Sequence, residues 1–312
     1  MTEILEDLKT AVDARLGLVA NEVGNTPLHL FTSLGSSPNV KIYGKKEWEQ
    51  LSGSVKIRAA YRIIRQAILN GELRNDKILL DATSGNTGIA YASIAAKIGI
   101  RVTLCLPENA SQERKDILES LGAEIISTSR FEGTDGAQEV AKALFRENPG
   151  TYFYADQYRN DNNWQAHYKS GTADEIYNAL PEITHFVSAL GSTGTLVGTG
   201  RRLKEIDRNI QIIGLQPDSP MHGLEGWKHL ETALIPTIYD PNVADEIVEI
   251  SAEESYEMIK TIYRNEGLLL SPSSAGNIVG ALKVAERLEQ GTIVTMLPDN
   301  ADKYSEIIKK IL

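Results

Sequence analysis

The sequence has little cysteine and no long apolar run. Its single cysteine, Cys105, cannot form a disulfide within the chain or contribute to a zinc site built from several cysteines. Cys105 lies in a strand-like apolar run, so we interpret it as a core side chain rather than a nucleophile. A transmembrane helix needs roughly 18 consecutive apolar residues. No such run exists, and we expect no membrane span.

Metal-binding and basic patterns are also missing. The 5 histidines show no His-Glu-x-x-His or comparable spacing, so we expect no metal. The net charge of −10, without long clusters of lysine and arginine, argues against a nucleic-acid partner. The acidic start Met1-Thr2-Glu3 does not lead into an apolar segment, so we expect no signal peptide and a cytoplasmic location.

Strand-like and helix-like segments alternate from about Lys77 onward. This alternation predicts an α/β fold in which helices cover a parallel sheet. A helix is predicted over 54–69, and another begins at a capping box, Ser251 to Glu254. Gly122 and Gly267 are predicted helix stops. Strands are predicted at 78–82, 102–106, 124–128, 152–154, 185–190, 211–216, 246–250 and 292–297.

The chain of 312 residues is long enough for two lobes. We predict a smaller domain over 45–149 with a mobile substrate loop region, and a larger domain over 1–44 and 150–312 that holds a cofactor phosphate. The first crossing is placed at a predicted turn near Gly44. The irregular stretch 217–245 is interpreted as a loop facing the substrate, because loops of this length in compact domains are often functional.

Two glycine-rich segments each follow a predicted strand and open a helical segment. They are Ser-Gly-Asn-Thr-Gly at 84–88 and Gly-Ser-Thr-Gly-Thr at 191–195. Backbone N–H groups at such helix starts bind anions, and hydroxyl side chains add donors. Each segment alone could also be an ordinary tight turn. Neither matches a P-loop or a dinucleotide fingerprint, and no serine-hydrolase elbow is present.

Lys56 stands at the start of a predicted helix, behind Gly53-Ser54-Val55. Taken alone, such a lysine would be a solvated surface residue. Together with two anion-binding loops, it indicates a phosphate-bearing cofactor held by a lysine.

The order of these motifs resembles the cysteine synthase family of fold type II pyridoxal-phosphate enzymes, which also includes tryptophan synthase β chains. Thr193 makes the chain most similar to the cysteine synthase B branch, which is like O-phosphoserine sulfhydrylases. Nine markers occur in register: 24–28, 53–56, 83–88, 111–114, Gln157, 166–168, 191–195, 273–274 and 298–299.

The resemblance implies two open, twisted, mainly parallel sheets wrapped by helices, with pyridoxal 5'-phosphate as the cofactor. It implies a homodimer that makes L-cysteine from an activated serine, O-phosphoserine or O-acetylserine. The sulfur donor would be sulfide, thiosulfate or the thiocarboxylate of a carrier protein.

The resemblance also implies a role for each site residue. Lys56 would form a Schiff base with the cofactor and move the substrate α-proton. Asn86 would bond the phenolate oxygen. Ser273 would face the ring nitrogen, where a neutral hydroxyl does not favour ring protonation. The phosphate would be held by Gly191, Ser192, Thr193, Gly194 and Thr195. The substrate carboxylate would be bound by Thr83, Ser84, Gly85, Thr87 and Gln157.

Departures from the family leave the exact reaction open. Ile57 stands where the family usually has Asp, Ala275 where it has Gly, and Asn300-Ala301 where it has Arg/Glu-Gly. The alternatives are a cysteine lyase, a cystathionine β-synthase-like enzyme and, more remotely, a non-catalytic regulatory protein of the same fold. Lys228, on the long loop, is either a ligand for a substrate phosphate or a solvated lysine.

Overall fold

The computed structural model describes residues 14–34, 37–83 and 85–312. The chain divides into two compact units. The first unit comprises 1–24, 50–52 and 56–162, and the second comprises 25–49, 53–55 and 163–312. The predicted domain limits, 45–149 against 1–44 with 150–312, stay a prediction. Within the described ranges, no helix is long and apolar enough to cross a membrane.

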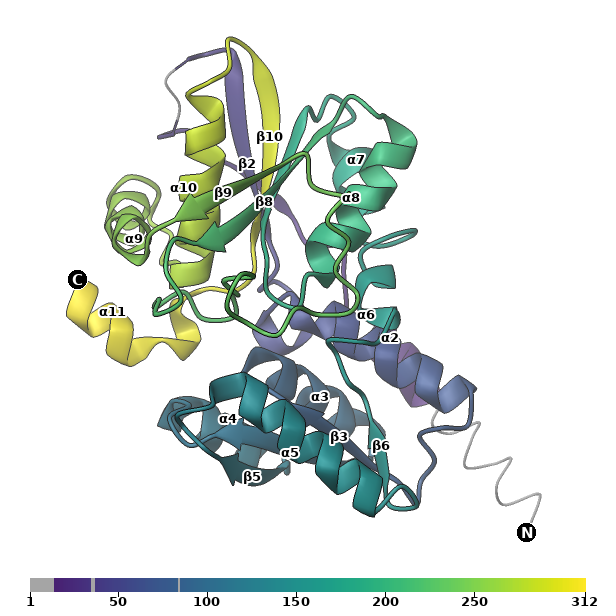
Figure 1. Ribbon diagram of the computed structural model, residues 1–312. Coiled ribbons are helices and arrows are strands. Elements are labelled where there is room, and N and C mark those ends of the chain that lie inside the picture. The colour runs from purple at the N-terminus through teal and green to yellow at the C-terminus, as the bar shows by residue number, and fades with distance from the viewer. Residues whose placement is uncertain (1–13, 35–36, 84) are drawn as a thin grey trace. The chain divides into compact units, whose positions relative to one another are not determined.

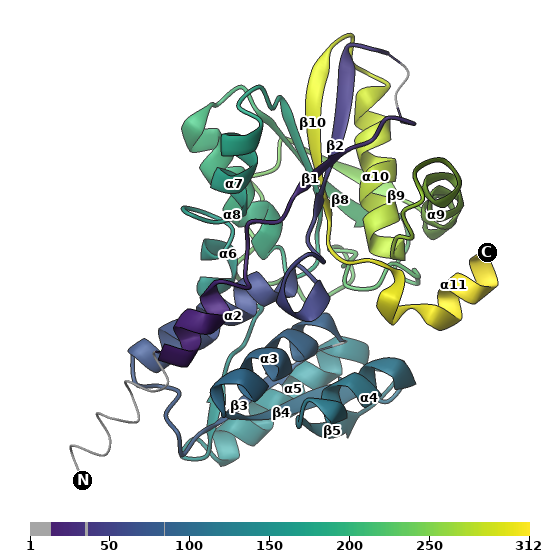
Figure 2. The same cartoon turned by 180° about the vertical axis from the view of Figure 1, so that it is seen from behind.

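The second unit contains a mainly parallel sheet with the strand order β1-β2-β10-β7-β8-β9 in the described part of the chain (Figures 1 and 2). Only the pair β1 and β2 is antiparallel among these strands. The strands are β1 (Leu28–Leu30), β2 (Val40–Lys46), β7 (His185–Ala189), β8 (Gln211–Pro217), β9 (Glu246–Ile250) and β10 (Gly291–Leu297).

Helices cover both faces of this sheet (Figure 1). On one face, α7 (Thr172–Ala179) and α8 (Gly194–Ile206) pack against apolar side chains that include Phe186. On the other face, α10 (Pro272–Ala285), with α9 (Ala252–Glu266) beside it, packs against side chains that include Val187. Neighbouring strand residues thus serve opposite faces, as the alternation of side chains along a strand requires. The short α11 (Ser305–Ile311) follows β10.

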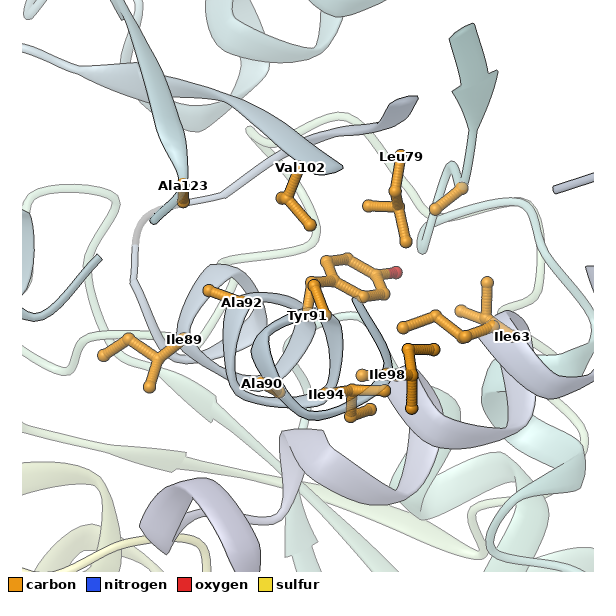
Figure 3. Close-up of a cluster of buried hydrophobic side chains, with 14 of the residues drawn as sticks. Ile63, Leu79, Ile89, Ala90, Tyr91, Ala92, Ile94, Ile98, Val102 and Ala123 are labelled. Carbon is orange, nitrogen blue, oxygen red and sulfur yellow. The ribbon is translucent and has the colours of Figure 1, made fainter. Parts of the chain in front are cut away.

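The first unit contains a parallel sheet with the order β5-β4-β3-β6 in the described residues. Its strands are β3 (Ile78–Ala82), β4 (Arg101–Pro107), β5 (Glu124–Thr128) and β6 (Tyr152–Tyr154). Helices α2 (Lys56–Leu69), α3 (Asn86–Ile98) and α4 (Gln112–Ser120) share one apolar cluster with the sheet, and α5 (Gly133–Glu147) packs in another. Figure 3 shows the ring of Tyr91 in the first cluster, among Leu79, Val102 and Ile63.

The predicted fold class, two mainly parallel sheets wrapped by helices, is confirmed. Four of the eight predicted strands have the predicted limits, and the other four differ by one residue at one or both ends. The capping box is present: Ser251 Oγ accepts from Glu254 N at 3.1 Å, and Glu254 Oε2 accepts from Ser251 N at 3.2 Å. Gly267 ends α9 with a left-handed φ of 69°.

Strands β1 and β2 were missed, and the turn predicted near Gly44 is wrong. Gly44 lies inside β2, where a Cβ atom would come within 2.5 Å of the Leu297 side chain. The next residue of β2, Lys45, is charged, and its side chain is 1% exposed. Its Nζ lies 2.8 Å from Glu175 Oε2 and donates to Thr26 O at 2.8 Å, so the buried charge is paired.

Helix α2 begins at Lys56, two residues later than predicted. The backbone N–H of Val55 donates to Pro298 O at 2.8 Å, which holds Val55 in a turn before the helix. The irregular stretch is confirmed, since residues 218–245 contain neither helix nor strand. Its side chains Leu224 and Trp227 are buried in the core on one face of the sheet, and Leu230 and Val243 on the other. This loop is therefore anchored by its own apolar residues.

Gly198→Ala should destabilise the second unit. Gly198 lies in α8, and a Cβ atom there would come within 1.9 Å of the Trp164 carbonyl oxygen, which is backbone and cannot swing away. We expect a loss of about 1–3 kcal/mol in the free energy of unfolding, measured by denaturant titration. Gly17→Ala is the control: residue 17 is helical and has nothing within 4 Å, so this variant should gain about 0.4–1 kcal/mol. Equal stability of the Gly198 variant and the parent would contradict the close contact.

Candidate active site

In the first unit, the loop after β3 closes around the Thr83 side chain. Thr83 Oγ1 accepts hydrogen bonds from the backbone N–H groups of Gly85 at 3.0 Å and Gly88 at 3.2 Å. A Cβ atom on Gly85 would come within 2.6 Å of the Arg114 side chain, so the loop lies close to Arg114. Ser84 lies outside the described residues.

Gln157, which follows β6, is bound to the same loop. Its Oε1 accepts from Thr87 Oγ1 at 2.9 Å, and its Nε2 donates to Ala82 O at 3.1 Å. Thr83, Gly85, Thr87 and Gln157 are therefore brought together at the carboxyl ends of β3 and β6, where open α/β sheets bind ligands. Their proposed contact with a substrate carboxylate stays a prediction.

Lys56 and Asn86 each begin a helix of the first unit. Lys56 is the first residue of α2 and is half-buried, and Asn86 is the first residue of α3. The two helices pack against each other in one apolar cluster, as Ile63 of α2 and Ile98 of α3 show in Figure 3. The amine and the amide are thus carried by two helix starts on a common core.

In the second unit, the predicted phosphate loop has the geometry of an anion site. Thr193 is the N-cap of α8 with a left-handed φ of 70°, and its side chain makes no capping bond to the described residues. Its hydroxyl is buried and has no hydrogen-bond partner within the described part of the chain. A buried hydroxyl and an uncapped helix start both require acceptors, which a phosphate supplies.

The two glycines of this loop are fixed by close approach. A Cβ atom on Gly191 would come within 2.1 Å of Gly226 O, and one on Gly194 within 2.1 Å of Asn163 Oδ1. Lys228 lies beside the loop, because its backbone N–H donates to Leu190 O at 2.7 Å, directly before Gly191. The long loop therefore borders the anion site.

Two residues from the segment after β6 support the same loop. Asn163 Nδ2 donates to Ser192 Oγ at 3.1 Å. The ring of His167 is buried. Its Nε2 lies 3.4 Å from Thr195 Oγ1, and its Nδ1 lies 2.8 Å from Thr172 Oγ1. His167 entered the sequence analysis as a family marker without a role, and Asn163 was missed. No periodic pattern marks either residue, because Asn163 lies in the short helix α6 (Asn162–Gln165) and His167 lies in the turn after it.

Ser273, in the first turn of α10, lies beside a buried carboxylate. Its Oγ is 3.3 Å from Asp299 Oδ1 and 3.2 Å from Ser271 Oγ. Tyr304 Oη donates to Asp299 Oδ2 at 2.7 Å. The backbone carbonyl of Asp299 accepts from the hydroxyls of Ser271 at 3.2 Å and Ser274 at 2.5 Å. The sequence predicted a neutral hydroxyl at this position, and the structure adds a carboxylate behind it.

These residues fit pyridoxal 5'-phosphate. The second unit supplies an anion site with a buried hydroxyl in need of an acceptor, and a hydroxyl suited to a ring nitrogen. The first unit supplies an amine and an amide at helix starts. Within the residues described, no group of three or more His, Cys, Asp or Glu side chains could hold a metal ion.

Asp81, at the carboxyl end of β3, is a buried carboxyl that the sequence analysis did not single out. Its Oδ1 accepts from Ala82 N at 2.8 Å and its Oδ2 from Gln157 N at 3.3 Å. Burial raises the pKa of Asp81 to about 7, and the nearby charge of Asp156 acts in the same direction. Burial also raises the pKa of Tyr91, and the charge of Asp81 adds to that shift.

Comparison with known proteins gives consistent matches. The family described as "Pyridoxal-phosphate dependent enzyme" matches residues 19–299. A cysteine synthase from Aquifex aeolicus is 40% identical over 90% of this chain and 88% of the relative. A cysteine synthase B from Pseudomonas aeruginosa is 38% identical over 92% of this chain and 95% of the relative.

Two further proteins broaden the comparison. An O-acetylserine dependent cystathionine β-synthase from Bacillus subtilis is 34% identical over 90% of this chain and 94% of the relative. The crystal structure of a cysteine synthase from Entamoeba histolytica matches with a TM-score of 0.86 at 33% identity, covering 92% of this chain and 88% of that one.

Asp81→Asn should remove a pH-dependent loss of stability. With a folded pKa of about 7 against an ordinary 3.8, the folded chain binds more protons than the unfolded chain between these values. Stability therefore falls as the pH rises through this window. Relative to the variant, the free energy of unfolding of the parent should fall by on the order of 2 kcal/mol between about pH 5 and pH 8. Thermal unfolding of parent and variant at several pH values between about 5 and 8 measures this difference in stability. Parallel curves of stability against pH for the two proteins would contradict the raised pKa of Asp81.

Proposed function

Because this chain belongs to the cysteine synthase family of pyridoxal-phosphate dependent enzymes, we propose that it makes L-cysteine by replacing the β-substituent of an activated serine with sulfide. The observation that carries the proposal is the Thr193 loop: a helix start without a side-chain cap and a buried hydroxyl lacking a partner in the described residues. Such a loop supports a phosphate-bearing cofactor, and Lys56 supplies the amine that would hold it.

Each group of residues has a separate task in this reaction. Pyridoxal phosphate, when bound, supplies an electron sink for negative charge at the substrate Cα. Lys56 anchors the cofactor and then, as a free amine, takes the α-proton as general base. The loop from Gly191 to Thr195 holds the phosphate with N–H and hydroxyl donors. Asn86 donates to the phenolate oxygen through its amide.

The substrate carboxylate is held by neutral donors rather than by a cation. Thr87 is bonded to Gln157, and Thr83 Oγ1 accepts from the backbone of its own loop, so these side chains need little further ordering when a substrate binds. Fixing the carboxylate orients the bond to the α-proton toward Lys56. The β-substituent then leaves and sulfide adds.

A cystathionine β-synthase-like reaction is the second candidate. The relative from Bacillus subtilis carries that name. Ala275 and Ala301, which depart from the usual family residues, are buried in one cluster with Tyr304. They therefore shape the side of the pocket next to Ser273 and Asp299, and product analysis with sulfide against homocysteine separates the two reactions.

The leaving group and the partners are further parts of the proposal. We expect Lys228 to recognise the phosphate of O-phosphoserine, which its position beside the anion loop supports. Acetylated substrate remains the alternative leaving-group chemistry. We also expect a cytoplasmic homodimer, with sulfide or the thiocarboxylate of a sulfur-carrier protein as sulfur donor.

Lys56→Ala should abolish the covalent link to the cofactor. After loading with pyridoxal phosphate and reduction with borohydride, peptide mass mapping of the parent should find a pyridoxyl adduct on Lys56. The variant should lose both the adduct and cysteine formation. Lys309→Ala, which changes an exposed lysine of α11, is the control and should behave as the parent. A parent without an adduct on Lys56 would overturn the enzyme assignment.

Lys228→Ala should discriminate between substrates. Loss of a charge-assisted hydrogen bond to phosphate costs about 1.5–3 kcal/mol, so KM for O-phosphoserine should rise by about tenfold or more. KM for O-acetylserine should stay within about twofold of the parent, because that substrate carries no phosphate. Steady-state kinetics with both substrates measures this, again with Lys309→Ala as control. An equal effect on both substrates, or a weaker binding of the cofactor itself, would contradict substrate-phosphate recognition.

A further inference from the structure

We propose that Asp81 is a positioning residue for the reaction, because its carboxyl group holds Gln157 in the orientation that binds the substrate carboxylate. The inference rests on the proposed function, since Gln157 meets a substrate carboxylate only in a chain that binds an amino-acid substrate. Asp81 acts through Gln157 and not on the substrate itself.

The regular pairing of β3 with β6 ends just before Gln157. In the described residues, the backbone hydrogen bonds between these parallel strands stop at the bond from Ala155 N to Leu80 O, at 2.9 Å. Asp156 then takes a left-handed φ of 45°, which turns the chain out of the strand. One step further along a parallel ladder, Ala82 N would donate to Ala155 O, and Ala82 O would accept from Gln157 N.

Side chains take the place of this missing step. Asp81 Oδ1 accepts from Ala82 N at 2.8 Å, and its Oδ2 accepts from Gln157 N at 3.3 Å. Gln157 Nε2 donates to Ala82 O at 3.1 Å, and Asn160 Nδ2 donates to Ala155 O at 2.9 Å. The backbone groups that leave the ladder are thus bound by nearby side chains.

These bonds fix both the backbone and the side chain of Gln157. Asp81 holds its N–H, Ala82 O holds its Nε2, and its Oε1 accepts from Thr87 Oγ1 at 2.9 Å. Gln157 is 3% exposed and Asp81 is 1% exposed, so water competes little for these bonds. Without the bond at its N–H, Gln157 would have to be ordered when the substrate binds, which weakens binding.

A carboxylate suits both N–H neighbours of this side chain. It accepts at both oxygens, whereas the amide of an asparagine offers one acceptor and one donor. In Asp81→Asn, the amide oxygen should keep the shorter bond, to Ala82 N, and the amide nitrogen would then face Gln157 N. Two donors facing each other make no hydrogen bond, so the substitution releases Gln157 selectively.

Protonation of Asp81 should have the same consequence as this substitution. Burial raises the pKa of Asp81 to about 7. As the pH falls through this value, the carboxyl loses its charge and one oxygen takes up a proton, so it holds the two N–H groups less strongly.

Several other ionisable groups surround Asp81. Those that face it are Tyr91 of α3, Cys105 of β4, Tyr154 of β6, and Asp156 and Tyr158 of the segment after β6. Behind them, Arg159 and Lys142 of α5 face Asp156, and Asp135 of α5 faces Tyr158. All of these groups are present in both the parent and Asp81→Asn, so a comparison of the two proteins over pH reports on Asp81.

Asp81→Asn should weaken substrate binding with little effect on turnover. At about pH 8, KM for the activated serine that the parent uses better should rise on the order of fivefold, which corresponds to the loss of one hydrogen bond. kcat should stay within about twofold, since the carboxylate is bound alike in the substrate complex and the transition state. The difference in KM should shrink to less than about twofold near pH 6, where the parent is protonated too.

A binding measurement and a double variant complete the test. L-Alanine has no leaving group, and its affinity for the loaded enzyme, measured by calorimetry, should fall by the same factor as KM rises. In a Gln157→Ala background, Asp81→Asn should change KM by less than about twofold, because the two residues form one hydrogen-bonded unit. If Asp81→Asn does not fold, Gln157→Ala carries the test: its KM should rise less steeply than that of the parent as the pH falls through 7.

Two control variants match the substitution. Asp76→Asn changes an exposed aspartate of the same unit. Tyr91→Phe removes a buried hydroxyl that faces Asp81 but leaves both N–H partners of the carboxyl in place. Both variants should keep KM within about twofold of the parent.

The outcomes separate this inference from the function on which it rests. An unchanged KM in Asp81→Asn, an equal rise in the parent and Gln157→Ala backgrounds, or an equal rise in Tyr91→Phe would overturn the role of Asp81 alone. A parent that forms no cysteine from O-acetylserine or O-phosphoserine would overturn this role together with the proposed function.

Discussion

Parallel strand pairing is the constraint on which the candidate residues of each unit depend. Parallel strands all point the same way, so the loops that follow them gather at one edge of the sheet. In the first unit this edge brings together the loop after β3 and Gln157 after β6. In the second unit, Gly191 follows β7 and Asp299 follows β10, and the loop after β8 borders the anion site through Lys228. Chemistry-bearing residues distant in sequence meet because their strands are parallel.

Buried polar groups at these edges are satisfied by neighbouring protein groups or are left for a ligand. Lys45 is paired with Glu175 and a backbone carbonyl, and Asp299 is held by Tyr304. The hydroxyl of Thr193 differs, because none of the described residues binds it. Since a buried polar group without a partner costs about 1–3 kcal/mol, and Thr193 stands at an uncapped helix start, a bound phosphate would supply the acceptor that its hydroxyl lacks.

Local pattern predicted the strands from Ile78 onward and failed where long-range contacts override it. Strands β3, β5, β6 and β9 were predicted with their observed limits because their strand-forming residues lie between clear breaks. Strand β2 was missed because Lys45 is polar and Gly44 is a typical turn residue. The presence of these two residues inside a buried strand is explained by partners far along the chain. Glu175 pairs with Lys45, and the Leu297 side chain leaves no room for a Cβ atom at Gly44.

The sequence by itself determined the α/β class and the two glycine-rich helix starts, because each depends on residues adjacent in the chain, and it pointed to Lys56 as the proposed cofactor amine. Tertiary structure decided which groups stand behind them. Three hydrogen-bonded pairs show this. Asn163 and Ser192 are 29 positions apart, Asp81 and Gln157 are 76 apart, and Asp299 and Ser273 are 26 apart. Hydrogen bonds over such separations leave no periodic trace in a single sequence. They arise when helices and parallel strands pack and bring the ends of distant segments to one edge.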